Sequence, residues 1–299
     1  HVVVSGWILD PDRKKMSKSR GNVVTPAALL DEFTADGVRY WASIARLGTD
    51  TAFDTTVLKI GKRLVVKLWN AGKFVLSQEA EKHPIVHELD RAFVAELAAL
   101  VKEATAAFDE FEYAKALMAT EQFFWASFTD TFLELVKARS RGDIGGPADR
   151  GSAVTALRLG LCVLLRLLAP VLPYITDEVW SWIFAKEKGH PSIHTASWPT
   201  IEELASAAPP PDDTGSFALA IAALTAINKR KSDDGVSVGR VTELLVLASN
   251  AATRARLEPV FADVAGAARC EDGRLETRAM EDGALTVLEV RFAEKAPKD

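Results

Sequence analysis

The stretch LKIGKRLVVKLWNAGKFVLS, residues 58–77, has the clearest helical period in this sequence. Its apolar side chains recur at the spacing of one helix face, so we expect an amphipathic helix packed against a core. The positions on that face are Ile60, Leu64, Leu68, Ala71 and Val75. The same period recurs in three further stretches, residues 88–111, 113–141 and 149–169. The sequence therefore predicts a mainly α-helical protein organised around a helical bundle.

The opposite face of this expected helix is basic. Lys59, Arg63 and Lys67 follow one another at a spacing of four residues, and Lys62 and Lys73 extend the series. No acidic residue interrupts it, which suits contact with a nucleic-acid backbone, because phosphates are bound through local rather than net positive charge. The alternative interpretations are a solvated helix face, or a helical scaffold in which the basic residues have no ligand.

A second stretch, DPDRKKMSKSRGN at residues 10–22, concentrates cations and hydroxyl groups. Five basic residues fall within eight positions, and two serines lie among them. Ammonium groups, hydroxyls and free backbone amides together suit a polyphosphate ligand. The basic residues are Arg13, Lys14, Lys15, Lys18 and Arg20. A solvated basic turn, or a nucleic-acid or targeting patch, is the alternative interpretation.

Residues 15–19 read KMSKS and are followed by Arg20, Gly21 and Asn22. This string resembles the KMSKS loop of class I aminoacyl-tRNA synthetases, which closes over ATP and steadies the pyrophosphate during formation of the aminoacyl-adenylate. The resemblance implies that ATP and Mg²⁺ are cofactors of the full-length enzyme. It also implies that Lys18 and Lys15 are catalytic residues, and that the ATP-binding loop consists of Lys15, Met16, Ser17, Lys18 and Ser19.

Further segments resemble the valyl and isoleucyl enzymes of that class. Residues 67–75 are similar to the opening of their anticodon-binding helices, and residues 164–180 are similar to a later helix of the same domain. Residues 48–54 resemble a stretch that distinguishes valyl from isoleucyl enzymes. The resemblance implies a valyl-tRNA synthetase, which activates valine with ATP and attaches it to tRNA(Val), and it makes the basic face a tRNA-binding surface. An isoleucyl enzyme and a non-catalytic tRNA-binding module remain as alternatives.

The resemblance implies five segments along the chain. Residues 1–25 would form the end of the class I catalytic (Rossmann-like) domain with the KMSKS loop, and residues 26–56 would contact the tRNA stem. Residues 57–185 would form the helical anticodon-binding domain. A linker over residues 186–215 would lead to a small α/β subdomain over residues 216–299.

The start of the chain indicates a fragment. Residues 1–9 read as an apolar strand, yet no preceding element could supply neighbouring strands. The His-Ile-Gly-His signature of class I enzymes does not occur in this sequence. We therefore expect a C-terminal part that lacks the editing domain and is inactive alone. Residues 293–299 are too few for the terminal coiled-coil arm that such enzymes often have.

Local signals predict several element boundaries. Thr25-Pro26 starts a helix over residues 27–33, and a second helix follows over 35–47. Thr176, followed by two acidic residues, has the pattern of a helix N-cap. Residues 202–214 are predicted to be an irregular linker, because they are rich in alanine and contain three consecutive prolines. The remaining predictions are helices at 217–231 and 251–264 and strands at 242–248, 274–280 and 284–292.

Two charged groups are predicted to have structural roles. Asp130 and Glu134 lie one helical turn apart and could be interpreted as a paired acid site. An ion pair of Glu134 with Lys137 or Arg141 is the simpler interpretation. Lys229, Arg230 and Lys231 end a helix, where cations suit the helix dipole.

Composition sets the remaining expectations. The chain has 299 residues, a net charge of −5 and two cysteines, Cys162 and Cys270, without ligand spacing. No secretory pattern is present, and the longest apolar run is broken by Arg166 and Pro170. We therefore expect a cytoplasmic monomer that is not associated with a membrane.

Two histidine pairs could suggest a metal site. His83 with His87, and His190 with His194, each have the spacing of a helical zinc pair. A proline follows the first histidine of each pair, and neither pair has the glutamate of the His-Glu-x-x-His pattern. We therefore expect neither structural zinc nor another protein-bound metal.

Overall fold

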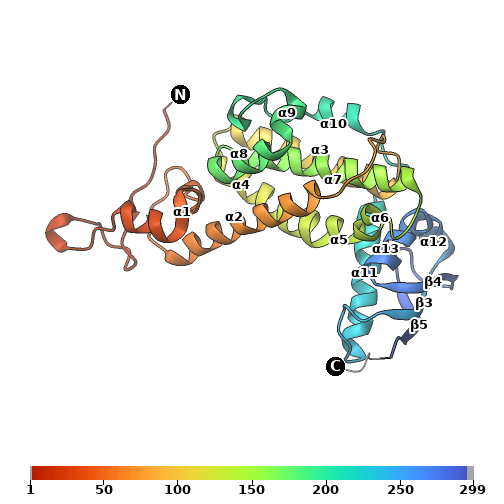
Figure 1. Ribbon diagram of the computed structural model, residues 1–299. Helices are drawn as coiled ribbons and strands as arrows, with labels where there is room; N and C mark the ends of the chain where they lie inside the picture. The colour runs from red at the N-terminus through yellow and green to blue at the C-terminus, as the bar shows by residue number, and fades with distance from the viewer. Residues whose placement is uncertain (1, 295–299) are drawn as a thin grey trace. The chain divides into compact units, whose positions relative to one another are not determined.

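The computed structural model describes residues 2–294, which form two compact units (Figure 1). Unit 1 contains residues 2–77, 98–125 and 158–201, and unit 2 contains residues 78–97, 126–157 and 202–294. Two long helices, α3 (Glu88–Asp109) and α7 (Pro147–Leu168), supply residues to both units. Helices dominate and the strands are few, so the predicted mainly α fold is confirmed.

The first residues of unit 1 form a very short sheet. Strand β1 (Ile8–Leu9) pairs in parallel with β2 (Thr51–Ala52). The predicted strand over residues 1–9 is therefore wrong except at its last two positions, because its partner strand is only two residues long. Residue 1 lies outside the described part of the chain.

Helix α1 (Pro26–Ser43) begins where predicted, with Thr25 as its N-cap residue and proline in its first turn. It is interrupted at Thr34, whose φ of 65° and ψ of 164° are not helical. This confirms the prediction of two helical segments, although the second ends at Ser43 rather than residue 47. The conformation of Thr34 is one that glycine adopts most readily.

Helix α2 (Thr55–Leu76) starts at Asp54, whose carboxylate accepts the Thr56 N–H at 2.7 Å. Its apolar face is buried as predicted, except that Ile60 is only partly covered. A Cβ at Gly61 would lie 2.8 Å from the Tyr40 ring, so glycine allows α1 to pack closely on α2.

The start of α8 (Pro173–Trp182) differs from the prediction. Thr176 lies inside the helix, where its hydroxyl donates to the Leu172 carbonyl at 2.7 Å. The cap comes instead from Asp36 of α1, whose carboxylate accepts the Tyr174 and Ile175 N–H groups at 3.2 and 2.7 Å. Burial raises the pKa of Asp36, and these two hydrogen bonds act in the opposite direction. The predicted cap is wrong because the first-turn amides are satisfied from a distant residue.

Unit 1 also contains the short elements η1 (Lys18–Arg20), α4 (Tyr113–Gln122), α9 (Phe184–Lys188) and η3 (Ile193–Thr195).

The predicted helix over residues 113–141 is not continuous. After α4 the chain continues as the π-helix η2 (Phe123–Phe132), then as α5 (Leu133–Leu135) and α6 (Lys137–Arg141). Val136, with ψ of 2°, separates the last two helices. Within unit 2, the Phe93 and Phe132 rings stack with centroids 3.8 Å apart. Both side chains are fully buried, so this ring pair belongs to the core of unit 2.

Unit 2 contains a three-stranded sheet in the order β4-β3-β5, which can be followed in Figure 1. The central strand β3 pairs in parallel with β4 and antiparallel with β5, so the predicted βαβ unit is confirmed. Strand β4 begins four residues earlier than predicted. The elements of this subdomain are α11 (Ser216–Asp233), β3 (Thr242–Ser249), α12 (Ala251–Leu257), η4 (Glu258–Val260), α13 (Phe261–Ala267), β4 (Cys270–Thr277) and β5 (Thr286–Phe292).

The predicted irregular linker over residues 202–214 is wrong in its first half, which forms α10 (Ile201–Ala207). The second half is held by the buried carboxylate of Glu88, which accepts the Asp212 and Asp213 N–H groups at 3.0 and 2.9 Å. Arg91 also pairs with Asp212 at 2.7 Å. This segment is therefore an ordered part of unit 2.

Among the described residues, α7 is the one helix that is long and apolar enough to cross a membrane. Its most apolar part is 83% buried within the protein, as in the core helix of a water-soluble domain.

Candidate phosphate-binding loop and nucleic-acid interface

The loop at residues 10–22 is organised by Asp10, which is 7% exposed. Its carboxylate accepts the Lys14 N–H and the Asn22 side-chain amide, both at 2.7 Å. The Lys14 N–H and then Asn22 hold the pKa of Asp10 below its usual range. Asp10 is therefore a carboxylate at neutral pH and fixes the two ends of the loop to each other.

Asn22 continues this arrangement into the loop. Its side-chain oxygen accepts the Ser17 N–H at 2.9 Å, and its amide nitrogen also donates to the Lys15 carbonyl at 3.3 Å. Gly21 makes the return turn with φ of 67°, a conformation that favours glycine. One side chain thus holds the backbone on both sides of Met16.

The cations of the loop point to solvent. Lys15, Lys18 and Arg20 are all exposed, and Lys15 Nζ lies 5.4 Å from the centre of the Trp7 ring. The Ser17 and Ser19 hydroxyls are 3.2 Å apart. Within residues 2–294, Lys18 makes no ion pair, so its ammonium group is available to an anionic ligand.

Met16 differs from its neighbours in the predicted ATP-binding set. It lines a mainly apolar cavity of about 480 Å³, together with Trp7, Trp41 and Phe53. An apolar side chain in such a cavity attaches the loop to the body of unit 1, whereas the lysines and serines remain free to contact phosphate.

The five predicted tRNA-binding residues all lie on the polar face of α2. Lys59, Lys62, Arg63 and Lys73 are exposed, and Lys67 is half-buried. Lys62 donates to the Glu32 carbonyl at 2.7 Å, so part of its hydrogen-bonding capacity is used within unit 1. The KMSKS residues and the α2 residues occupy different elements and form two clusters rather than one site.

Aromatic rings lie among these cations. Lys67 Nζ is 5.0 Å from the centre of the Trp125 ring, and Lys73 Nζ is 5.8 Å from that of Trp69. Trp69 is 38% exposed and packs edge-on against Trp182. Trp69 was not among the residues predicted to bind tRNA, although its position on the polar side of the helix was a usable signal. An exposed tryptophan between cations is a surface on which an unpaired base can stack.

Three histidines of the two candidate pairs make contacts within the protein. His83 packs against Gly151, while the backbone carbonyl of His190 accepts the indole N–H of Trp180 at 2.9 Å. His194 Nε2 lies 3.2 Å from the Pro173 carbonyl. No group of three His, Cys, Asp or Glu side chains within residues 2–294 is arranged to hold a metal ion.

Two known protein families match parts of this chain. Residues 90–246 match the anticodon-binding domain of tRNA ligase, and residues 1–54 match tRNA synthetases class I (I, L, M and V). The first match covers more than half of the chain, so the chain belongs to the tRNA ligase anticodon-binding family. The KMSKS loop lies inside the class I match, which is where that motif is expected.

Individual proteins that are similar to the chain indicate a narrower class than the family matches do. The chain is 44% identical to the valine–tRNA ligase of Thermobifida fusca (strain YX) over 98% of this chain and 33% of that protein. It is 45% identical to the valine–tRNA ligase of Salinispora tropica (strain ATCC BAA-916) over 89% of this chain and 32% of that protein. It is 41% identical to the valine–tRNA ligase of Cutibacterium acnes (strain DSM 16379) over 99% of this chain and 33% of that protein. The predicted resemblance to valyl-tRNA synthetases is confirmed. The chain spans about a third of the length of these curated relatives.

A solved structure also aligns with the chain. It is the ternary complex of Agrobacterium radiobacter K84 agnB2 LeuRS with tRNA and LeuAMS. The alignment covers 67% of this chain and 24% of that chain, at 23% identity and a TM-score of 0.47.

Proposed function

We propose that this chain is the C-terminal part of a valyl-tRNA synthetase, the enzyme that joins valine to tRNA(Val) using ATP. One observation carries the proposal. The KMSKS loop, with its exposed lysines and its Asp10–Asn22 hydrogen bond, occurs in a chain that is 44% identical to a valine–tRNA ligase over 98% of its length.

We assign Lys18 and Lys15 to the triphosphate of ATP. Both ammonium groups are exposed, and a fixed cation stabilises negative charge that develops on phosphate oxygens during adenylate formation. Ser17 and Ser19 supply neutral donors beside them, and Met16 anchors the loop in the apolar cavity. Mg²⁺ would neutralise further phosphate charge.

We assign the basic face of α2 to the tRNA backbone. The residues are Lys59, Lys62, Arg63, Lys67 and Lys73. Their support is the exposure of four of the five cations, together with the nearby Trp69 ring, which offers a stacking surface for an unpaired base.

The same proposal assigns the segments of the chain. Residues 1–25 end the catalytic domain, residues 26–56 contact the tRNA stem, and residues 57–185 form the anticodon-binding domain. Residues 186–215 connect this domain to the α/β subdomain at 216–299. Valine selection, editing and the rest of adenylate formation would then depend on parts of the enzyme outside this chain.

We also propose a monomeric cytoplasmic enzyme. The support is that Cys162 and Cys270 are free thiols and that the apolar surface of α7 is used in the protein core.

The test of the loop assignment is Lys18→Ala in the full-length enzyme, with valine-dependent pyrophosphate exchange and tRNA binding measured side by side. We expect the adenylation rate to fall by about 10²–10³-fold, the loss typical for removal of one preorganised donor to developing charge. Affinity for tRNA should be nearly unchanged. Lys14→Ala is the matched control, because Lys14 is also exposed but lies 3.7 Å from the Asp12 carboxylate.

Equal loss of adenylation and of tRNA affinity in Lys18→Ala would contradict the assignment. So would equal effects of the Lys14 and Lys18 substitutions, since they would make the loop a diffuse patch of positive charge.

A further inference from the structure

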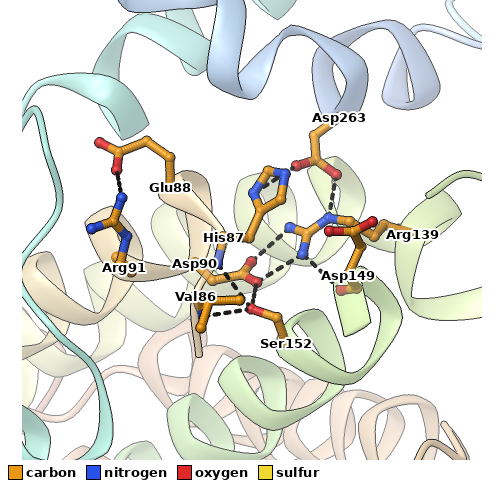
Figure 2. Close-up of polar contacts among 9 residues, drawn as sticks. All are labelled: Val86, His87, Glu88, Asp90, Arg91, Arg139, Asp149, Ser152 and Asp263. Carbon is orange, nitrogen blue, oxygen red and sulfur yellow. Dashed lines mark hydrogen bonds and ion pairs between the residues drawn. The ribbon is translucent and has the colours of Figure 1, made fainter. Parts of the chain in front are cut away.

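Figure 2 shows a cluster of buried charged groups in unit 2, and its residues belong to α3, α6, α7 and α13. Arg139 of α6 binds Asp90 of α3 through two parallel hydrogen bonds, each of 2.7 Å. Its third side-chain bond, from Nε, reaches Asp263 of α13 at 2.9 Å. The Ser152 hydroxyl of α7 donates to the Asp90 carboxylate at 2.6 Å and accepts the backbone N–H of His87 at 3.2 Å. The cluster therefore fixes the α/β subdomain to the helices within this unit.

One corner of the cluster is incomplete. Asp263 Oδ2 and His87 Nδ1 are both buried, and neither has a hydrogen-bond partner among the described residues. The two atoms are 3.7 Å apart, too far for a hydrogen bond but near enough to form one after a small rotation of either side chain.

The charges also do not balance. Asp90 and Asp263 would carry two negative charges, whereas Arg139 carries one positive charge, and all three side chains are at most 2% exposed. The charged groups that face Asp263 are Arg139, Asp90 and the imidazole of His87. Asp149 of α7 contributes only its backbone carbonyl to Arg139, and its carboxylate accepts the Gly146 N–H. An uncompensated buried charge is strongly destabilising, so the pair of unpartnered atoms is where a compensating proton belongs.

We propose that this cluster is a proton-binding site, in which His87 Nδ1 and Asp263 Oδ2 share one proton at neutral pH. The shared proton makes the cluster electrically neutral and supplies the missing hydrogen bond. Burial raises the pKa of Asp263, while its bonds to Arg139 act against that shift. The proton belongs to the pair rather than to one residue.

The direction of the pH effect follows from counting protons. In the unfolded chain the histidine loses its proton near its ordinary pKa of about 6.5, and the aspartate is already ionised there. The folded pair keeps one proton to higher pH. Stability from this site is therefore fully present below about pH 6.5 and is lost as the pH rises through the pKa of the folded pair.

The Asp263→Asn variant distinguishes a shared proton from a simple ion pair between Arg139 and Asp263. The amide oxygen can still accept from Arg139, and the amide nitrogen can donate to neutral His87. The cluster is then neutral and fully bonded without an added proton. Asp90→Asn is the matched control, because it removes the same charge but breaks the paired hydrogen bonds to Arg139.

Tryptophan fluorescence does not report on this cluster, because every tryptophan lies in unit 1. Native-state hydrogen exchange of β3 and α13, measured on this chain from pH 5 to pH 9, gives the opening equilibrium of unit 2 directly. Comparing variants at the same pH cancels the intrinsic exchange rate.

Above about pH 6.5, we expect the opening constant of the wild-type chain, relative to Asp263→Asn, to rise by up to tenfold per pH unit. Asp90→Asn should open more readily than Asp263→Asn at every pH. The side-chain NMR signals of His87 and Asp263, identified with the His87→Gln and Asp263→Asn variants, should show that the pair holds one added proton at neutral pH.

The proposal would be overturned if the opening constant of the wild-type chain, divided by that of Asp263→Asn, stayed constant across the pH range. It would also be overturned by NMR signals showing, at neutral pH, an ionised Asp263 beside a His87 ring that carries only one N–H, because the pair would then hold no added proton. If either asparagine variant fails to fold, these NMR signals of the wild-type chain still decide the question.

Discussion

The KMSKS loop of unit 1 and the buried cluster of unit 2 use the same kinds of charged side chains in opposite ways. In the loop, one buried carboxylate, Asp10, shapes the backbone, and the cations around it are exposed. In the cluster, Arg139 makes four hydrogen bonds to protein groups and is 2% exposed. Charge that must meet a ligand is left in solvent, while charge that holds elements together is removed from it.

The largest expected effect comes from breaking the buried side of this comparison. Arg139→Met would leave Asp90 and Asp263 buried without their cation, and we expect a loss of roughly 3–5 kcal/mol in the free energy of opening of unit 2. Hydrogen exchange in β3 measures this loss. Arg274→Met is the control, because its ion pair with Asp272 is exposed, and it should leave the opening unchanged. A similar result for both variants would show that burial does not distinguish the two ion pairs.

The exposed side of the comparison can be tested on α2. Replacing Lys59, Arg63 and Lys67 together by glutamate should weaken tRNA binding by roughly 10–100-fold at moderate salt, and should reduce the salt dependence of binding. Arg274 of β4, Arg278 directly after β4 and Arg291 of β5 provide a control triple with the same charge change. If the α2 triple binds tRNA as the wild-type chain does, its basic face is only a solvated surface.

The smallest expected effect concerns the positioning of the loop. Asn22→Ala removes the hydrogen bonds to Asp10, to the Ser17 N–H and to the Lys15 carbonyl. In the full-length enzyme we expect adenylation to slow roughly tenfold, the scale of one or two lost hydrogen bonds, with tRNA affinity unchanged. Faster hydrogen exchange at residues 15–22 would mark the cause as loss of loop order. An unchanged exchange rate together with slower adenylation would contradict the positioning role.

Much of the fold could be predicted because its signals are local. The helical period of residues 58–77 identified α2, and the alternation of strands and helix after residue 216 identified the βαβ unit. The expected ion pair of Glu134 with Lys137 is present at 3.0 Å. Each of these depends on residues that are close in sequence.

The features that could not be predicted depend on distant residues. Asp90, Arg139 and Asp263 are separated by 49 and 124 positions, and each alone has the pattern of a surface helix residue. Lys231 was interpreted as a dipole-compensating cation, yet its ammonium group is buried and donates to the carbonyls of Val238, Arg240 and Ala268. Desolvation lowers the pKa of Lys231. A single sequence does not show which charged residue will be enclosed in this way.

The site was predictable only in part for the same reason. The KMSKS string identified the loop and its lysines, because the motif is contiguous. The role of Asp10 required the structure, since its hydrogen bond to Asn22 spans twelve residues. Trp69 was not selected from the sequence, and its exposed fraction of 38% shows it as a surface for a base.

The most direct test of the central claim is binding of this chain to a tRNA with a valine anticodon, compared with the same tRNA carrying an isoleucine anticodon, over a series of salt concentrations. The account predicts a preference for the valine anticodon that persists at moderate salt, because base contacts, unlike phosphate contacts, do not depend on counterion release. Equal binding of the two tRNAs that disappears as salt rises would contradict it, and would leave a phosphate-binding module without anticodon recognition.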